Sequence, residues 1–78
     1  MNQSVSYNDA MFFAEVNSYI THDDDRKLIK HAYDYAKVKH EGQYRKSGEP
    51  YFVHLINVGT ILAQLRVGPS TIAAGLQC

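Results

Sequence analysis

Apolar residues recur at helical spacing in three stretches of this 78-residue chain. In the first, from about Asn8 to Ile20, positions i, i+4, i+7 and i+8 mark one face of an amphipathic helix. The residues at those positions are Phe12, Val16, Tyr19 and Ile20. Asn8 or Asp9 is suited to cap this helix, because a short polar side chain accepts a hydrogen bond from an unpaired backbone N–H group.

A second helix is predicted to begin near Thr21, which forms with Asp24 a pattern similar to a capping box, with aspartate in place of the usual Glu or Gln. The apolar stripe that follows places Leu28, Ala32, Tyr35 and Ala36 on one side, extended by Ile29 and Tyr33. This helix is expected to run to about His40. Gly42 then supplies the stop, since glycine adopts the left-handed conformation that ends many helices.

The stretch from Gln43 to Pro50 has no periodicity and contains a serine, a glycine and a terminal proline, so it is predicted to be a loop. A nearly all-round apolar pattern from Phe52 to Leu65 then predicts a buried helix. Gly59 inside it is expected to permit a close crossing with another helix.

After the break at residues 68–70, Pro69 suits the first turn of a short last helix, Ser70 to Leu76. Period-two alternation between turn residues, the signal of strands, is missing. The sequence therefore predicts an all-α fold of about four helices.

The composition narrows the class of protein. Eight basic and eight acidic residues give a net charge of zero, and the single cysteine, Cys78, excludes both an intramolecular disulfide and a cysteine-rich zinc site. No signal-peptide pattern and no apolar run long enough to span a membrane are present. A cytoplasmic protein with no membrane partner is expected.

The positive charge is concentrated, because seven of the eight Lys and Arg residues lie between Arg26 and Lys46. A solvated helix end, where cations complement the helix dipole, explains Lys37 and Lys39. It explains Arg45 and Lys46 less well. The segment suits a small anionic ligand better than a long nucleic-acid backbone.

Arg45, Lys46 and Ser47 form a compact set of hydrogen-bond donors beside Gly48. A guanidinium pairs with phosphate or stacks on a ring, and an ammonium and a hydroxyl add phosphate contacts. This pattern indicates nucleotide or phosphate binding. A basic surface loop without a ligand is an equal alternative from spacing alone, because no P-loop fingerprint is present.

His54, at the start of the apolar helix, is a candidate metal ligand, although a histidine in this setting is more often a hydrogen-bonded core residue. His31 and His40 are nine positions apart, so they cannot form the i,i+4 pair of helical zinc proteases. Tyr44 and Tyr51 flank the basic stretch, which leaves stacking on single-stranded RNA as a weaker alternative. Core packing is the stronger interpretation for Tyr51.

The run HAYDYAKVKHEGQYRKSGEPYFVHLINVGTILAQL, followed by STIAAGL, resembles the opening of the hydrolase domain of the RelA/SpoT family. These bifunctional enzymes of the stringent response make and degrade guanosine tetra- and pentaphosphate (ppGpp and pppGpp). The resemblance covers about Leu28 to Leu76, and RKSGEPY with the histidine that follows is its most specific part. It implies an all-helical, manganese-dependent HD-type phosphohydrolase, paired in the family with a GTP pyrophosphokinase.

The resemblance also implies roles for individual residues. His54 matches the first histidine of the family's manganese site. Arg45, Lys46 and Ser47 match the loop that lines its guanine-nucleotide pocket, with the arginine packing on guanine. In the family the metal activates a water that attacks the 3′-pyrophosphate and releases pyrophosphate and GDP or GTP.

The match fails after Leu76, where the family continues with an aliphatic residue and a His-Asp pair and this chain reads Gln77 and Cys78. Leu55 also replaces the proline that usually follows the first histidine. His54 and Cys78 together make two ligands where a catalytic site generally needs three. Residues 1–78 are thus expected to be an incomplete N-terminal portion of the hydrolase domain, inactive alone and without the synthetase domain.

Two other classes stay open. One is a non-catalytic module that self-associates through an exposed apolar face of the third helix. The other is a binder of nucleotide or RNA through the basic loop, with nucleic acid the less favoured partner.

Overall fold

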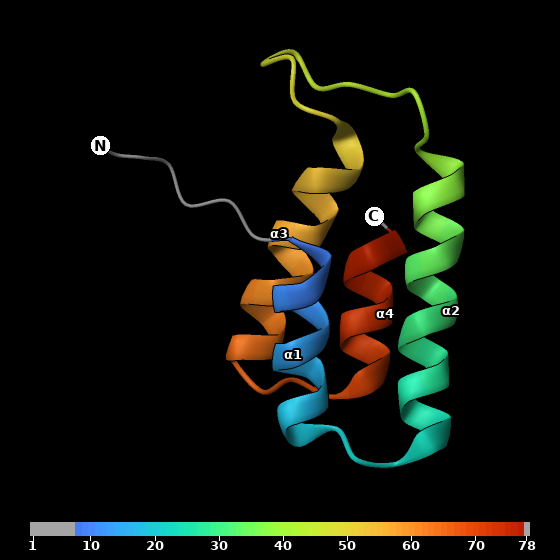
Figure 1. The fold of residues 1–78 in the computed structure, drawn as a ribbon, viewed down its shortest axis with the longest axis vertical. Helices are drawn as coiled ribbons and strands as arrows, with labels where there is room; N and C mark the ends of the chain where they lie inside the picture. The colour runs from blue at the N-terminus through green and yellow to red at the C-terminus, as the bar shows by residue number, and fades with distance from the viewer. Residues whose placement is uncertain (1–7, 78) are drawn as a thin grey trace.

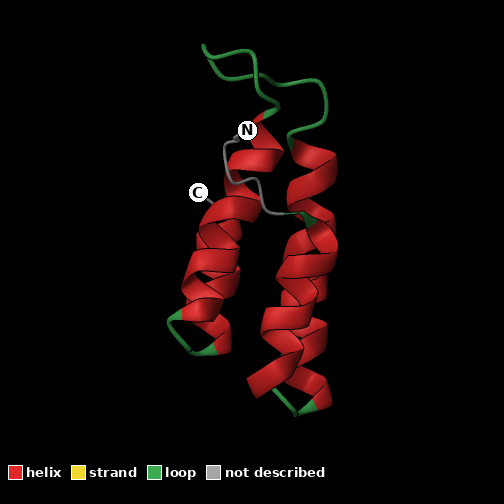
Figure 2. Ribbon diagram, turned by 60° about the vertical axis from the view of Figure 1, so that its left-hand side comes forward, coloured by secondary structure: helices red, strands yellow, loops and turns green. Residues whose placement is uncertain are grey.

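The computed structural model describes residues 8–77, which form four helices and so confirm the all-α prediction. These are α1 (Asp9–Tyr19), α2 (Asp23–Lys39), α3 (Tyr51–Gln64) and α4 (Pro69–Gln77). The last helix, α4, packs against both α2 and α3, and α1 packs on α3 (Figure 1). The long connection between α2 and α3 extends beyond one end of the bundle, as Figure 2 also shows.

The core takes buried side chains from all four helices. The fully buried residues include Phe12 of α1, Ile29 of α2, and Ile72 and Leu76 of α4. From α3 come Leu55, Ile56 and Ala63. Burying such side chains removes apolar surface from water, which is the main favourable term in folding.

Gly59 permits the close helix crossing that the sequence predicts. A Cβ atom added at this position would lie 2.8 Å from Cε1 of Phe12 and 3.2 Å from Cδ2 of Leu76. Helix α3 therefore approaches α1 and α4 at the same point, and a side chain at Gly59 would separate them.

The caps agree with the sequence at α1 and differ at α2. The side chain of Asn8 accepts a hydrogen bond from the Met11 amide at 2.9 Å, as predicted. At α2 the predicted Thr21–Asp24 capping box is wrong, because the N-cap is His22 and it makes no side-chain capping bond. Instead, the Arg26 side chain donates at 2.7 Å to the carbonyl of Ile20, which fixes the connection between the two helices.

The buried face of α2 is narrower than the predicted stripe. Ile29, Ala32, Tyr33 and Ala36 are buried, at positions i, i+3, i+4 and i+7 of one helix face. Leu28 and Tyr35 flank this face and are 44% and 53% exposed. The predicted stripe was therefore too broad. Leu28 and Tyr35 are apolar or aromatic like the buried residues, so the sequence does not indicate that they stay partly exposed.

Tyr33 links α2 to α1. Its hydroxyl donates to the Asp9 carboxylate, and its ring lies 4.9 Å from that of Phe13 and 5.4 Å from that of Phe52. Burial, together with the Asp9 carboxylate, raises the pKa of the Tyr33 hydroxyl well above its ordinary value.

Helix α3 is buried on one side only, although its sequence predicts a nearly fully buried helix. Ile61 is 47% exposed, and Leu65, at the end of the helix, is 69% exposed. The reason is that α1 and α4 cover a single face of α3 in the described chain. Within residues 8–77, no helix combines the length and apolar character needed to cross a membrane.

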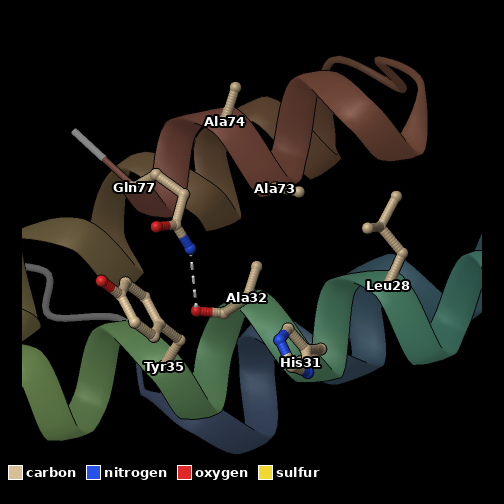
Figure 3. A pocket seen from close by; sticks show the side chains of 7 residues that line it. All are labelled: Leu28, His31, Ala32, Tyr35, Ala73, Ala74 and Gln77. Atoms are coloured by element: carbon tan, nitrogen blue, oxygen red, sulfur yellow. Dashed lines mark hydrogen bonds between the residues drawn. The ribbon is translucent and has the colours of Figure 1, made fainter.

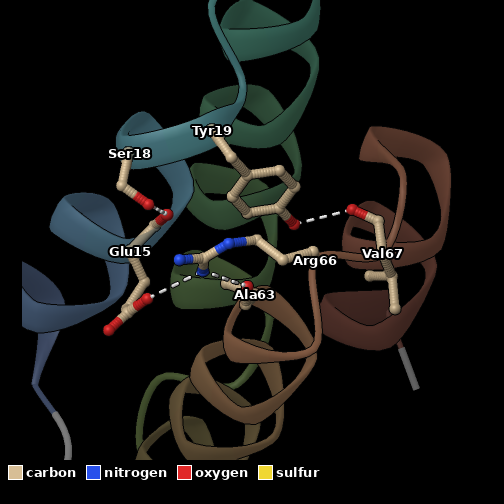
Figure 4. Close-up of polar contacts among 6 residues, drawn as sticks. All are labelled: Glu15, Ser18, Tyr19, Ala63, Arg66 and Val67. Carbon is tan, nitrogen blue, oxygen red and sulfur yellow. Dashed lines mark hydrogen bonds and ion pairs between the residues drawn. The ribbon is translucent and has the colours of Figure 1, made fainter.

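The turn from α3 to α4 is held by Arg66, which adopts a positive φ of 61° (Figure 4). Its guanidinium lies 5.1 Å from the centre of the Tyr19 ring and donates at 3.3 Å to Glu15 and at 3.1 Å to the Ala63 carbonyl. The Tyr19 hydroxyl donates at 2.6 Å to the carbonyl of Val67. Burial raises the pKa of that hydroxyl, and the Arg66 cation partly offsets the effect.

Candidate functional site

The connection between α2 and α3 is a loop, as predicted, and residues 44–50 of it form a tight hairpin. Tyr44 and Pro50 form an isolated antiparallel bridge. Beyond the bridge, the Arg45 amide donates at 2.8 Å to the Glu49 carbonyl, and the Gly48 amide donates at 2.8 Å to the Arg45 carbonyl. Gly48 has a φ of 93°, as expected for glycine after a tight turn in a three-residue hairpin loop.

This hairpin brings together three of the four predicted site residues. Arg45, Lys46 and Ser47 line one open pocket of about 600 Å³, together with the rings of Tyr44 and Tyr51. We call this space the hairpin pocket. Two cations, a hydroxyl and two aromatic rings are the groups that bind phosphate and a planar base.

The cations of the hairpin pocket have few competing partners. The only carboxylate that pairs with Arg45 in the described chain is Glu49, at 3.8 Å with both side chains partly exposed. Such a long, solvated pair contributes little to stability. No carboxylate among residues 8–77 pairs with Lys46. Both side chains are therefore available to an anion.

The fourth predicted residue, His54, lies in the first turn of α3 and does not line the hairpin pocket. It is half-buried, and its ring lies 5.8 Å from the ring of Tyr51. Tyr51 thus lies between the pocket and the candidate metal ligand. The structure brings His54 near the basic residues through this ring rather than by direct contact.

The sequence missed two participants in this arrangement. Tyr51 packs against the core, as expected, but its partly exposed side chain also forms a wall of the pocket. His40, given little weight as a candidate, lies at the end of α2 with its ring 4.6 Å from that of Tyr51. The available signal was their placement on either side of Arg45, Lys46 and Ser47 in the sequence.

A separate hollow lies between α2 and α4 (Figure 3). It has a volume of about 390 Å³ and is lined mainly by Leu28, Tyr35 and three alanines, with the Gln77 side chain donating at 3.4 Å to the Ala32 carbonyl. It shares no residue with the hairpin pocket. Its apolar lining does not suit a phosphorylated ligand.

A metal site cannot be completed from the residues that the structure describes. No group of three or more His, Cys, Asp or Glu side chains in residues 8–77 is placed to hold a metal ion. His54 therefore belongs to no such group in the described residues, whereas catalytic metals usually have at least three protein ligands. Cys78, the other candidate in the sequence, lies outside the described residues.

Comparison with known proteins assigns the class. The family model described as the HD domain matches residues 32–78, more than half of the chain. The chain therefore belongs to the HD domain family. The match includes the hairpin, His54 and the helices α3 and α4.

Individual relatives are more specific. The chain is 40% identical over 76 residues to a guanosine-3′,5′-bis(diphosphate) 3′-pyrophosphohydrolase of Spiroplasma citri, covering 97% of this chain and 10% of that protein. It is 48% identical over 54 residues to a GTP pyrophosphokinase of Myxococcus xanthus, covering 69% of this chain and 7% of that protein. It is 43% identical over 54 residues to the bifunctional (p)ppGpp synthase/hydrolase SpoT of Escherichia coli K12, covering 69% and 8%.

These relatives agree with the resemblance to the RelA/SpoT family seen in the sequence. The chain spans a tenth or less of the length of each of them.

Proposed function

We propose that this chain is the N-terminal portion of the HD hydrolase domain of a RelA/SpoT-type enzyme, and that its hairpin pocket binds the guanine nucleotide. The observation that supports this best is the gathering of Arg45, Lys46 and Ser47 around one pocket bounded by Tyr51. These groups are contributed by a hairpin with its own backbone hydrogen bonds. They do not depend on a flexible loop closing over a ligand.

The chemistry of the pocket matches the substrate named in the relatives. Guanosine-3′,5′-bis(diphosphate) carries two diphosphate groups and a planar purine. The Lys46 ammonium and the Ser47 hydroxyl are suited to phosphate oxygens, and the Arg45 guanidinium is suited to stack on guanine or to pair with phosphate. We also propose a cytoplasmic location, which the sequence pattern predicts.

The resemblance further implies a manganese ion, for which His54 would be one ligand. Such a metal, when bound, supplies a water of lowered pKa as nucleophile. Residues 8–77 provide no cluster of three or more His, Cys, Asp or Glu side chains that could hold it. We therefore assign no step of hydrolysis to them, and we propose that the chain alone does not release pyrophosphate.

Nucleotide binding is tested by isothermal titration calorimetry, in which guanosine tetraphosphate is added to the 78-residue chain. Replacing Arg45 or Lys46 by alanine should weaken binding about tenfold, since one hydrogen bond to a charged group contributes about 1.5–3 kcal/mol. Lys27→Ala, an exposed lysine in the first part of α2, is the matched control and should bind as the parent does. Equal weakening by all three variants would indicate non-specific charge attraction and would contradict the pocket.

Hydrolysis is tested separately by measuring pyrophosphate released from guanosine tetraphosphate in the presence of manganese. The folded chain and its His54→Ala variant should be equally inactive. Release that disappears in His54→Ala would overturn the proposal of an inactive chain, because it would require further ligands from another part of the sequence or from a second chain.

The exposed residues Ile61 and Leu65 favour one alternative, self-association through α3. Light scattering after size-exclusion chromatography distinguishes a dimer from a monomer. A dimer that an Ile61→Lys substitution converts to monomers would support this alternative, and a parent chain that is monomeric at high concentration would exclude it.

A second alternative is RNA binding through residues 37–46, which should show steep salt dependence. An RNA affinity that is insensitive to salt would argue against it.

A further inference from the structure

The ring of His40 is fixed at the end of α2 in one tautomer. Its Nδ1 lies 2.8 Å from Oε1 of Gln43, while Nε2 of Gln43 donates at 3.4 Å to the carbonyl of Lys39. The second bond orients the Gln43 amide, so its oxygen faces His40. An amide oxygen only accepts hydrogen bonds, and Nδ1 of His40 must therefore carry the hydrogen.

In the neutral ring, this tautomer leaves Nε2 of His40 without a hydrogen, as an acceptor. The atom is buried and has no hydrogen-bond partner in the described chain. A buried polar atom without a partner destabilises the fold. If His40 served only to pack, a phenylalanine would fill the same space without that cost. The bond from Nδ1 to Gln43 is the feature that distinguishes histidine from phenylalanine here.

Gln43 connects three segments through its backbone as well as its side chain. Its amide donates at 3.0 Å to the His40 carbonyl, and its carbonyl accepts at 2.9 Å from the amide of Tyr51. It thereby ties the end of α2, the base of the hairpin and the first residue of α3. Gln43 and Tyr51 are therefore joined directly through the backbone.

Tyr51 is in contact with both parts of the proposed site. Its ring is 4.6 Å from the ring of His40 on one side and 5.8 Å from the ring of His54 on another. The same ring forms a wall of the hairpin pocket. Whatever fixes the Tyr51 ring therefore fixes the shape of the pocket and the surroundings of His54 together.

We propose that His40 and Gln43 are positioning residues, which hold the Tyr51 ring between the hairpin pocket and His54 without contacting the nucleotide themselves. This inference rests on the proposed function of the pocket. On this proposal, His40 strengthens nucleotide binding, although its unpartnered nitrogen lowers the stability of the fold.

The first experiment compares His40→Phe and Gln43→Met with His31→Phe, an exposed histidine earlier on the same helix. Phenylalanine keeps a ring against Tyr51 and removes the unpartnered nitrogen. We expect His40→Phe to melt at the same temperature as the parent or higher, yet to bind guanosine tetraphosphate about fivefold more weakly, as for one lost hydrogen bond. His31→Phe should change neither quantity.

Gln43→Met should weaken binding to a similar extent. The double variant should be no weaker than either single variant, because both remove one interaction. Unchanged affinity in His40→Phe and Gln43→Met, in a parent that does bind, would overturn the proposal. So would additive losses, which would indicate two independent contacts.

The second experiment needs no nucleotide, so it separates this inference from the proposed function. Long-range ¹H–¹⁵N spectra of the free chain should show hydrogen on Nδ1 of His40. The His54 ring and the Tyr51 amide should shift in His40→Phe and stay in place in His31→Phe. If the parent chain binds no nucleotide, the proposed function fails, and these spectra still decide the positioning role. Hydrogen on Nε2, or unshifted His54 signals, would overturn it.

Discussion

Two arginines lie outside the helices, and they are used in opposite ways. Arg66 lies in the turn between α3 and α4, where it stacks on Tyr19 and donates to Glu15 and to a backbone carbonyl. Arg45 lies at the other end of α3, in the hairpin, where its one carboxylate partner is 3.8 Å away. The guanidinium of Arg66 is occupied in holding the fold together, whereas that of Arg45 is available to a ligand. The surroundings of a charged group, rather than its residue type, decide between stability and binding.

The hairpin and the α3–α4 turn lie at opposite ends of α3 and depend on the same hydrophobic core. Disrupting that core should therefore lower stability and nucleotide binding together. Phe12 is fully buried and contacts α3 at Gly59. We expect Phe12→Ala to lower the free energy of unfolding by about 3–5 kcal/mol, through lost burial and a cavity. In a domain of this size that loss should also abolish nucleotide binding, because the chain would be largely unfolded.

Chemical denaturation monitored by circular dichroism measures this change. Met11→Ala, at an adjacent position that is 41% exposed, is the control and should cost far less. Equal losses from Met11 and Phe12 would show that the core is not centred where the structure places it.

The second largest effect should be specific to the hairpin. We expect Arg45→Ala to reduce the affinity for guanosine tetraphosphate about tenfold, and to change the free energy of unfolding by less than about 0.5 kcal/mol. The reason is that its partner Glu49 is distant and solvated. Calorimetric titration and denaturation of the same sample provide both numbers. A large loss of stability would mean that Arg45, like Arg66, is a structural residue.

The reverse outcome is expected at the turn. Arg66→Ala removes a stacking contact and a partly exposed ion pair, and it should destabilise the chain by about 1 kcal/mol. Nucleotide affinity should not change. Arg66→Gly loses the same contacts, but glycine adopts the positive φ of 61° without steric strain. The glycine variant should therefore be more stable than Arg66→Ala.

Thermal melting of the three proteins should give the order parent, glycine, alanine, from most to least stable. A glycine variant that is less stable than the alanine variant would contradict the assigned backbone conformation.

The smallest effect should appear only at high pH. The pKa values of Tyr19 and Tyr33 are raised in the folded chain above the ordinary value of 10.0. A group whose folded pKa is raised stabilises the fold fully below its unfolded pKa and loses that contribution as pH rises toward the folded pKa. The free energy of unfolding should therefore fall above about pH 10.

Denaturation series between about pH 8 and about pH 11 measure this decline on both sides of the ordinary tyrosine pKa. Tyr33→Phe should flatten the decline more than Tyr19→Phe, since the pKa of Tyr33 is raised further. A decline of unchanged slope in both variants would assign the effect to other groups.

Much of the fold could be predicted because it is encoded locally. The boundaries of α3 and α4 follow from Pro50, Pro69 and the apolar run between them, and the structure places them within a residue or so. The Asn8 cap could also be predicted from the sequence, because the amide that donates to its side chain, that of Met11, is only three residues away. The covered face of α2 could not be predicted, because Leu28 and Ile29 are both strongly apolar and only the packing of the other helices decides which one is buried.

The candidate site divides in the same way. Arg45, Lys46 and Ser47 are adjacent in sequence, so their proximity needed no tertiary information. Tyr51 and His54 are three positions apart on α3, so helical spacing already places their rings together. The contact of Tyr51 with His40 instead joins α3 to the end of α2, where Gln43 bonds to the backbone of both residues. No periodicity encodes that contact. The sequence predicted a loop at this place, and the hairpin within the loop depends on backbone hydrogen bonds that the residue pattern does not show.

The backbone bonds inside the hairpin have a consequence for the kinetics of recognition. Because the bonds at Arg45, Gly48 and Tyr51 order this segment during folding, little conformational entropy remains to be lost when a ligand arrives. Association should then be limited by diffusion and by electrostatic attraction to the two cations, so its rate should fall with added salt. The lifetime of the complex, rather than the speed of its formation, should distinguish one nucleotide from another.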